Sequence, residues 1–310
     1  MLEIVYIGLL YKYMYREVPH TEVPNYPSNV VEVDRNKVTI NYDALTTYLI
    51  KRFAIITYNK TIYIYENGRY VEDIGQIGKT VEKILLLQGV ADKRKVREVV
   101  NEVTARIMWR TAFRYYPFNC WGSKFINLKN GVLFRKEDGY ILLPHSPAFV
   151  FSYRLPVKYN PEAKCPKIEK FISEVVDKEN IPILYEIPAL CLMQDEKIPY
   201  AYMLVGSGAN GKSTYLNLLQ EFLGKENVSN VSLQELCEDR FKVAQLVGKL
   251  ANIYAFQSSF HRDRKLRPIK EHVIRSFNPL FIELRDYFDL EEDLEELFQS
   301  SFHRGNCKRI

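Results

Sequence analysis

The chain has 310 residues, of which 47% are hydrophobic and 26% charged, and its formal net charge is +5 at pH 7. That length is enough for two domains, and the balance of apolar and charged residues is ordinary for a soluble globular protein. The mild positive charge permits a nucleic-acid partner without requiring one.

The cysteines argue against a zinc site and against a disulfide framework. They are five in number, far apart, and form no C-x-x-C pair: Cys120, Cys165, Cys191, Cys237 and Cys307. A cytoplasmic location is the simplest expectation, because the cytoplasm is reducing. The apolar start Ile4–Leu10 is too short to span a bilayer and lacks signal-peptide features, so no membrane association is expected.

Residues 1–29 are predicted to be a linker or an upstream remnant, since three prolines fall within 17–29. Residues 30–180 are predicted to form an N-terminal α/β module. Its expected elements, in chain order, are a helix over 42–53, strands over 54–58, 61–66 and 69–71, helices over about 78–88 and 92–111, β-structure over 125–145, and a helix near 167–178.

The expected helix over 92–111 is rich in basic residues. Two interpretations stay open for its start, and the first is favoured: a solvated face, or a stripe that contacts single-stranded DNA. The candidate nucleic-acid residues on this stretch are Lys93, Arg94, Lys95 and Arg97.

Residues 181–255 are predicted to be a partial nucleotide-binding core. An apolar helix over 181–193 precedes the strand-like run Tyr200–Val205, and Gly206-Ser-Gly-Ala-Asn-Gly-Lys-Ser213 follows at once. This loop matches the pattern G-x-x-x-x-G-K-[ST] at every fixed position. A helical stretch then runs to Leu223, with Gly224 placed as its C-cap. Strand, glycine loop and helix together indicate a phosphate-binding loop.

The chemistry follows from the residue types. Glycines let the backbone turn tightly and aim successive N–H groups at one anion, to which the start of the helix adds its positive dipole end. Lys212 can reach the β- and γ-phosphates of ATP, and the Ser213 hydroxyl can ligate Mg²⁺. The candidate site residues are Gly206, Ser207, Gly208, Ala209, Asn210, Gly211, Lys212, Ser213 and Thr214.

Beyond the loop helix, Ser232-Leu-Gln-Glu235 has the pattern of a capping box that opens a helix to about Val247. The run Leu250–Phe256 is typical of a buried strand.

Several short sequence segments of the chain together resemble the plasmid, phage and poxvirus type of primase-helicase, a branch of the superfamily-three helicases. They are Asn127-Leu-Lys-Asn-Gly131, Pro144-His-Ser-Pro147, Cys165-Pro166, the loop Gly206–Thr214, and Arg240-Phe followed by Leu246-Val-Gly-Lys-Leu-Ala-Asn-Ile253. The resemblance covers roughly residues 40–255.

The resemblance implies an α/β fold, in which a mixed α/β N-terminal module precedes a partial P-loop NTPase core of the AAA+ kind. It implies an ATP-dependent helicase that unwinds DNA during replication of a plasmid, virus or provirus. It also implies a homo-oligomeric ring, usually a hexamer, although an incomplete core argues against a ring for this chain. The primase domain that lies upstream in this family is not expected within these residues.

The family pattern breaks where it places the acid that holds Mg²⁺ through water. The matching strand runs into Ala255-Phe-Gln-Ser258, and the next acidic residue is Asp263. Glu283, at the end of the strand-like run Pro279–Glu283, is the candidate substitute acid. Residues 256–310 are otherwise predicted to be an atypical helical tail, including an amphipathic helix over 287–298.

A repeat suggests why the resemblance ends there. Phe256–Arg262 recurs verbatim as Phe298–Arg304, which is consistent with a broken or rearranged reading frame after Ala255. Such a truncation would leave the second core strand as an unpaired sheet edge. Two functions therefore stay open: an ATP-dependent DNA helicase, or a catalytically defective remnant that binds nucleotide, DNA or a partner.

Overall fold

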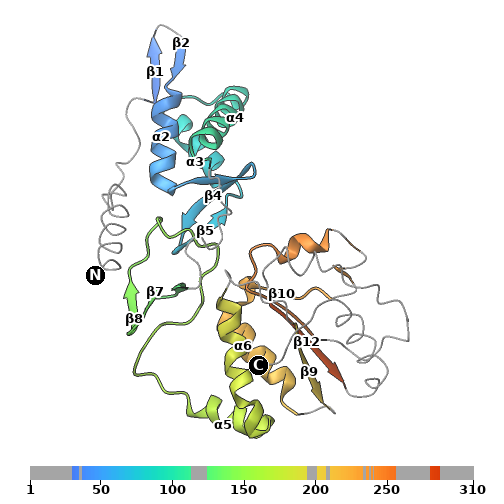
Figure 1. The fold of residues 1–310 in the computed structure, drawn as a ribbon. Helices are drawn as coiled ribbons and strands as arrows, with labels where there is room; N and C mark the ends of the chain where they lie inside the picture. Colours follow the sequence, from blue (N-terminus) through green and yellow to red (C-terminus); the bar gives the residue numbers. More distant parts are fainter. Residues whose placement is uncertain are drawn as a thin grey trace, which may run out of the picture. The chain divides into compact units, whose positions relative to one another are not determined.

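The computed structural model of the chain describes residues 30–34, 37–112, 124–193, 201–206, 210–232, 235–236, 239, 241–255 and 280–286. Its elements are α-helices and short sheets, so the predicted α/β fold class is confirmed (Figure 1). Two compact units are present, Met1–Trp121 with Leu143–Tyr153, and Gly122–Leu142 with Arg154–Ile310. This division does not coincide with the boundary at residues 180 and 181 drawn from the sequence. The predicted linker at 1–29 lies outside the described residues.

Three helices and two small sheets make up the described part of the first unit. The helices are α2 (Tyr42–Phe53), α3 (Gln76–Leu87) and α4 (Lys93–Arg110). The sheets are an antiparallel hairpin of β1 (Val31–Asp34) and β2 (Lys37–Ile40), and a meander of β3 (Ile56–Tyr58), β4 (Thr61–Glu66) and β5 (Arg69–Glu72). All were predicted except the first hairpin.

The helices of this unit form where apolar residues recur every three or four positions. On α4, the buried residues are Val96, Val99, Val103 and Ile107, which share one side of the helix. They pack into a single core with buried residues of α2 and α3. Each fully buried aliphatic side chain contributes about 1.5–3 kcal/mol of transfer free energy, so this side of α4 is fixed by the core and the other side faces solvent.

The segment Leu143–Tyr153 binds the meander through one tyrosine. The backbone N–H of Tyr70 donates to the Phe151 carbonyl (2.6 Å), and its hydroxyl donates to the Pro147 carbonyl (2.9 Å). The His145 ring lies over Gly68, where an added Cβ would be 2.9 Å from a ring carbon. The family-like phrase Pro144–Pro147 thus has a structural role in this unit.

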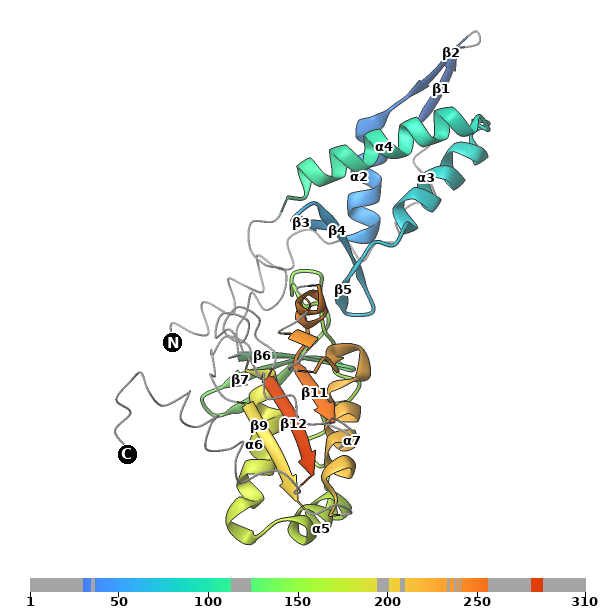
Figure 2. The ribbon, with the colours of Figure 1, turned by 90° about the vertical axis from the view of Figure 1, so that its right-hand side faces the viewer.

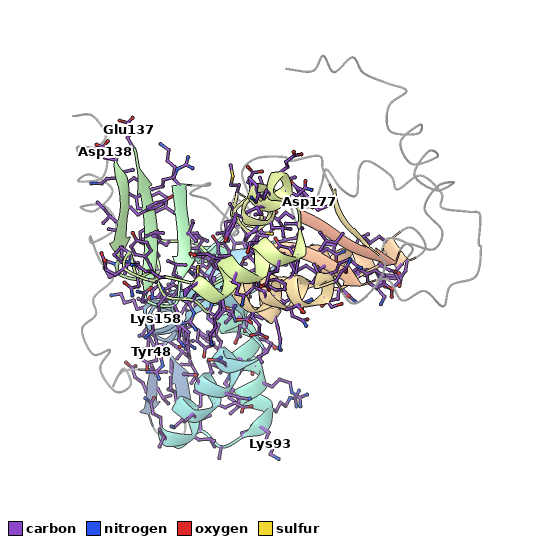
Figure 3. The ribbon with its side chains drawn as sticks, turned by 90° about the horizontal axis from the view of Figure 1, so that it is seen from below. Tyr48, Lys93, Glu137, Asp138, Lys158 and Asp177 are labelled. Atoms are coloured by element: carbon purple, nitrogen blue, oxygen red, sulfur yellow. The ribbon has the colours of Figure 1, made fainter. Side chains whose placement is uncertain are left out.

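In the second unit, the sheet of β6 (Phe125–Leu128), β7 (Gly131–Lys136) and β8 (Gly139–Leu143) uses the phrase Asn127–Gly131 as its first turn. The Asn130 side chain pairs with the Tyr159 backbone as a neighbouring strand would, accepting from its N–H (3.0 Å) and donating to its carbonyl (3.0 Å). Glu137 and Asp138 lie at the turn between β7 and β8 (Figure 3).

This unit also contains a four-stranded parallel sheet with the order β10-β11-β12-β9, of which Figure 2 shows β11, β12 and β9 side by side. The strands are β9 (Ala201–Gly206), β10 (Val228–Ser229), β11 (Ala251–Ala255) and β12 (Leu280–Asp286). Helix α7 (Lys212–Leu223) packs on β9 and β11, while α5 (Pro166–Val175) and α6 (Ile181–Leu192) precede the sheet in the chain.

Strand β12 corrects two expectations. Residues 280–286 belong to the stretch predicted as a helical tail, but the apolar run Leu280–Ile282 enters the sheet between β11 and β9. Strand β11 is therefore paired on both sides, and the prediction of an unpaired edge there is wrong. The predicted helix over 287–298, both copies of the repeat and the acid position at Asp263 lie outside the described residues.

The capping box at Ser232 is confirmed. The Ser232 N–H donates to Glu235 Oε2 (3.0 Å), and the Glu235 N–H donates to Ser232 Oγ (3.1 Å). The hydrogen bond from the Ser232 N–H, followed by those from Lys242 and from the Ser232 hydroxyl, holds the pKa of the Glu235 carboxyl below its usual value. The helix predicted to reach Val247 is wrong, because Asp239 is not helical and only a 3-10 turn, Lys242–Leu246, follows.

Candidate nucleotide-binding site

The predicted phosphate-binding loop joins a parallel strand to a helix. Strand β9 ends at Gly206, and α7 begins at Lys212. Ser207, Gly208 and Ala209 lie outside the described residues. In the described part of the loop, Asn210 is exposed and Gly211 is the residue before the helix. The strand–loop–helix order predicted for this motif is therefore present.

Gly211 adopts a conformation and a position that a larger residue would not tolerate. Its φ is +87°, which is in the left-handed region. A Cβ added here would lie 2.6 Å from Val175 Cγ1 and 3.3 Å from Phe171 Cε2. The backbone of the loop is thus held directly against the last turn of α5, and only glycine fits between them.

Polar groups gather at the start of α7. The Lys212 ammonium donates a hydrogen bond to Asn210 Oδ1 (2.8 Å), and Ser213 and Thr214 are exposed. The first bond of the helix runs from the Tyr215 N–H to the Gly211 carbonyl (2.9 Å), so the N–H groups before it have no partner within the helix. No acidic residue lies in this first turn. Such a helix start favours an anion.

The other side of α7 is anchored in the core. Tyr215 is buried, and its hydroxyl donates to the Leu184 carbonyl on α6 (2.7 Å). Burial raises the pKa of Tyr215, and it raises the pKa of the Cys191 thiol on α6 to about 12. Both groups therefore stay neutral at physiological pH. They support the helix, and they offer no charge to a ligand.

Strand β11 carries no acid among its described residues. Its buried polar side chain is Asn252, whose hydrogen bonds are made with β10 and the residues after it. Asn252 Oδ1 accepts from the Ser229 hydroxyl and from the Val231 N–H (both 2.9 Å), and its amide donates to the Val231 carbonyl (2.8 Å). Asn252 is thus a structural residue.

Glu283, the candidate substitute acid, lies in the middle of β12. In the register of the sheet, it pairs with Met203 of β9 and with Tyr254 of β11. The loop leaves β9 at Gly206, three residues further along. At about 3.3 Å per residue, this puts Glu283 about 10 Å from the end of the sheet where the loop lies. The backbone position does not bring Glu283 together with Lys212 and Ser213.

The four candidate nucleic-acid residues all fall on the first two turns of α4. Lys93, Arg94 and Arg97 are exposed, and Figure 3 shows the Lys93 side chain extending from the start of the helix. Lys95 is half-buried and paired with Glu98 (3.3 Å). Positive charges at a helix start are unfavourable, because the dipole is also positive there. Asp92 offsets part of this by capping the Arg94 N–H (2.9 Å).

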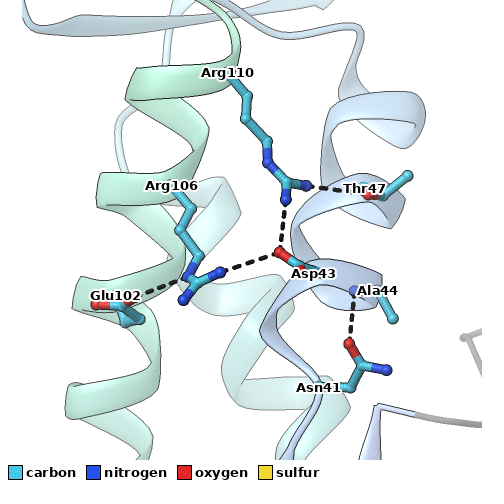
Figure 4. Close-up of polar contacts among 7 residues, drawn as sticks. All are labelled: Asn41, Asp43, Ala44, Thr47, Glu102, Arg106 and Arg110. Carbon is cyan, nitrogen blue, oxygen red and sulfur yellow. Dashed lines mark hydrogen bonds and ion pairs between the residues drawn. The ribbon is translucent and has the colours of Figure 1, made fainter.

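The basic residues further along α4 are engaged with α2. Asp43 Oδ1 accepts from both Arg106 (3.0 Å) and Arg110 (2.6 Å), and Arg106 also donates to Glu102 (2.7 Å), as Figure 4 shows. These pairs are solvent-exposed and contribute little to stability. They do occupy the two arginines, so the exposed positive charge of α4 lies at its start.

Two kinds of feature were not found among the described residues. Across these stretches, no three His, Cys, Asp or Glu side chains are placed to hold a metal ion together. None of the helices seen there is both long enough and apolar enough to cross a bilayer.

Comparisons with known proteins agree with the resemblance. Residues 47–177 match the family model described as D5 N terminal like, and residues 204–275 match a family of unknown function, DUF5906. The second match begins in β9, covers the loop and runs 20 residues past Ala255, where the sequence resemblance ended. A search of the curated proteins finds none that matches the chain.

Among solved structures, the chain is similar to the A form apo structure of the NrS-1 C-terminal region. The identity is 14% and the TM-score 0.45, with 78% of this chain and 56% of that chain covered. The chain therefore spans little more than half the length of that structure.

Proposed function

Because the chain belongs to the phage and plasmid primase-helicase family of replication proteins, we propose that it binds Mg²⁺-ATP at the loop Gly206–Ser213 as the helicase part of such a protein. The observation that carries the proposal is the start of α7. Lys212 opens the helix directly after Gly211, at the carboxyl end of a strand in a parallel sheet. Ligands of open α/β sheets bind at this end of the strands.

The residues present fit a nucleotide triphosphate. Gly211 takes the left-handed φ of +87° that the tight turn of such a loop requires, and the N–H groups ahead of Tyr215 have no acceptor within the helix, so this helix start suits a phosphate. Lys212 would exchange its bond to Asn210 for the β- and γ-phosphates, and the exposed Ser213 hydroxyl would ligate Mg²⁺. When bound, Mg²⁺ supplies positive charge against the phosphate oxygens.

DNA is the partner that the family and the charge of α4 favour. We assign the DNA contact to Lys93, Arg94 and Arg97. These three cations are exposed at the start of α4, where positive charge opposes the helix dipole and lowers the stability of the helix. The cap from Asp92 offsets part of this cost. Lys95 would contribute less, since it is paired with Glu98. Assembly into a homo-oligomeric ring would follow from the family and belongs to the same proposal.

A second function is favoured by the sequence of β11. A loop that keeps its lysine and glycines can bind phosphate. Without a carboxylate to hold Mg²⁺, which the family places at the end of the strand matching β11, hydrolysis is slower by orders of magnitude. If no other residue supplies that acid, the chain is a nucleotide- or DNA-binding module without turnover.

Hydrolysis measured with and without single-stranded DNA separates the two functions. The variants are Lys212→Ala and, as a matched control, Lys225→Ala, which removes an exposed lysine just past the other end of α7. Turnover that is lost in Lys212→Ala and kept in Lys225→Ala supports the helicase. Binding of ATP that depends on Lys212, without turnover, supports the non-catalytic module. ATP binding or turnover that is indifferent to Lys212 excludes the loop Gly206–Ser213 as the nucleotide site under either function.

A further inference from the structure

The parallel sheet brings one acidic residue to the edge at which the loop leaves β9. All four strands run in the same direction, so their carboxyl ends meet at this edge. In the register of β12 with β9, Asp286 is the partner of Gly206, the first residue of the loop. Neighbouring strands lie about 4.8 Å apart, so the Asp286 backbone is next to the start of the loop.

The other strands offer no competing acid in the described residues. Strands β9, β10 and β11 contain no Asp or Glu. Strand β11 ends at Ala255, which is level with Leu284, two residues short of Asp286. Glu283 is level with Met203 and therefore about 10 Å back from the edge. Asp286 is thus the carboxylic residue of the described sheet that stands level with the loop.

The site needs such a residue on chemical grounds. The loop supplies an ammonium group, a hydroxyl and backbone N–H groups, all of which suit phosphate oxygens. Mg²⁺ prefers oxygen ligands and is held in nucleotide sites by one or two carboxylates, the phosphates and water. A carboxylate on β12, the neighbour of β9, would complete the ligands of Mg²⁺ even though β11 has no carboxylate.

We propose that Asp286 is the carboxylate that holds the nucleotide-bound Mg²⁺ in this chain, in the role that the sequence alone offered to Glu283. The proposal rests on nucleotide binding at Gly206–Ser213 and names a further residue of the same site.

Metal-dependent nucleotide binding tests the assignment without requiring turnover. A ribose-labelled fluorescent ATP is titrated onto the full chain, once with excess MgCl₂ and once with EDTA. The wild type should bind more tightly with Mg²⁺. Asp286→Asn should lose about 10-fold or more of that gain and keep its affinity in EDTA. The matched variant Glu283→Gln should keep both.

Each other outcome overturns the assignment in a distinguishable way. An undiminished Mg²⁺ gain in Asp286→Asn excludes Asp286, and a gain lost only in Glu283→Gln returns the role to Glu283. No binding by the wild type in either buffer overturns nucleotide binding itself. If Asp286→Asn does not bind even in EDTA, Asp286→Glu decides: it retains the carboxylate, so it should restore both EDTA binding and part of the Mg²⁺ gain. If Asp286→Glu binds the labelled ATP in EDTA but no more tightly in MgCl₂, the assignment is also excluded.

Discussion

Gly211 and Val175 are in direct contact: a Cβ at Gly211 would lie 2.6 Å from Val175 Cγ1. The start of the loop helix is therefore packed against the end of α5, which precedes the sheet by about one helix in the chain. The contact is specific to glycine at this position, because Val175 and Phe171 fill the space that a side chain would need.

We predict that Gly211→Ala lowers stability and abolishes nucleotide binding. The methyl group forces overpacking against Val175, at about 1–3 kcal/mol, and adds strain at a φ of +87°. Val175→Ala removes the 2.6 Å contact but leaves the two contacts of 3.3 Å and the backbone strain, so the double variant should regain part of the lost stability. Chemical denaturation of the four proteins measures this cycle. Strictly additive changes would show that the two residues do not touch in solution.

Tyr215→Phe should destabilise the second unit while leaving the loop chemistry intact. The change removes the buried hydrogen bond to the Leu184 carbonyl, which costs about 1–3 kcal/mol when the carbonyl is left unsatisfied. The control is Tyr185→Phe, which removes a hydroxyl from the half-exposed Tyr185 on α6. Thermal denaturation should show a clear fall for the first and little change for the second. Equal effects would mean that the Tyr215 bond is not formed.

Cys191 should be silent toward thiol reagents in the folded protein. It is buried, whereas Cys165 is exposed, so iodoacetamide at pH 8 followed by peptide mass spectrometry should modify Cys165 before Cys191. Modification of Cys191 should require denaturant. Equal labelling of the two peptides in native buffer would contradict the burial of α6.

The buried thiol of Cys191 should make the free energy of unfolding depend on pH. Burial raises the pKa of Cys191 from 9.0 to about 12, so the folded state keeps its proton at pH values where the unfolded state has lost it. Its contribution to stability is fully present below pH 9 and is lost as the pH rises toward 12. Cys191→Ala should flatten this part of the stability curve, measured by denaturation at pH 8–10.5. An unchanged slope would place the thiol in solvent.

Removing three exposed cations from α4 should weaken DNA binding. The change is Lys93→Ala, Arg94→Ala and Arg97→Ala together, and the salt slope for single-stranded DNA should fall by about 2, since each phosphate contact contributes about 0.7. The control removes three exposed charges from β7 and the turn before it: Lys129, Arg135 and Lys136. Fluorescence anisotropy at several salt concentrations distinguishes the sets. A slope reduced only by the control would move the DNA contact to β7.

The first unit was largely predictable from local patterns. The helix Tyr42–Phe53 begins and ends where its periodicity places it, and the strands around Asn67-Gly68 follow from that turn. The hairpin of β1 and β2 was missed, although V-E-V-D and K-V-T-I alternate strictly between apolar and polar residues, because each run is only four residues long. The helix expected to reach Val247 was wrong, because the capping box fixes a start and says nothing about length.

The strand–loop–helix order of the candidate site was predictable from the sequence, but the residues that lie beside the loop in the fold were not. The spacing of Gly206, Gly211 and Lys212 indicates the strand–loop–helix order by itself. The contact of Gly211 with Val175 joins residues 36 positions apart, and no local pattern reports it. Likewise, the position of β12 beside β9 depends on the pairing of strands 80 residues apart, so no local pattern shows that Asp286 is level with Gly206.

Equilibrium binding of Mg²⁺-ATP to the wild type and to Lys212→Ala tests the central claim most directly. If the loop Gly206–Ser213 is a nucleotide site, the wild type binds ATP and the variant loses about 10-fold or more in affinity, since a charge-assisted contact to phosphate contributes about 1.5–3 kcal/mol. ATP binding of equal affinity in both proteins, or none in the wild type, would contradict the assignment of this loop.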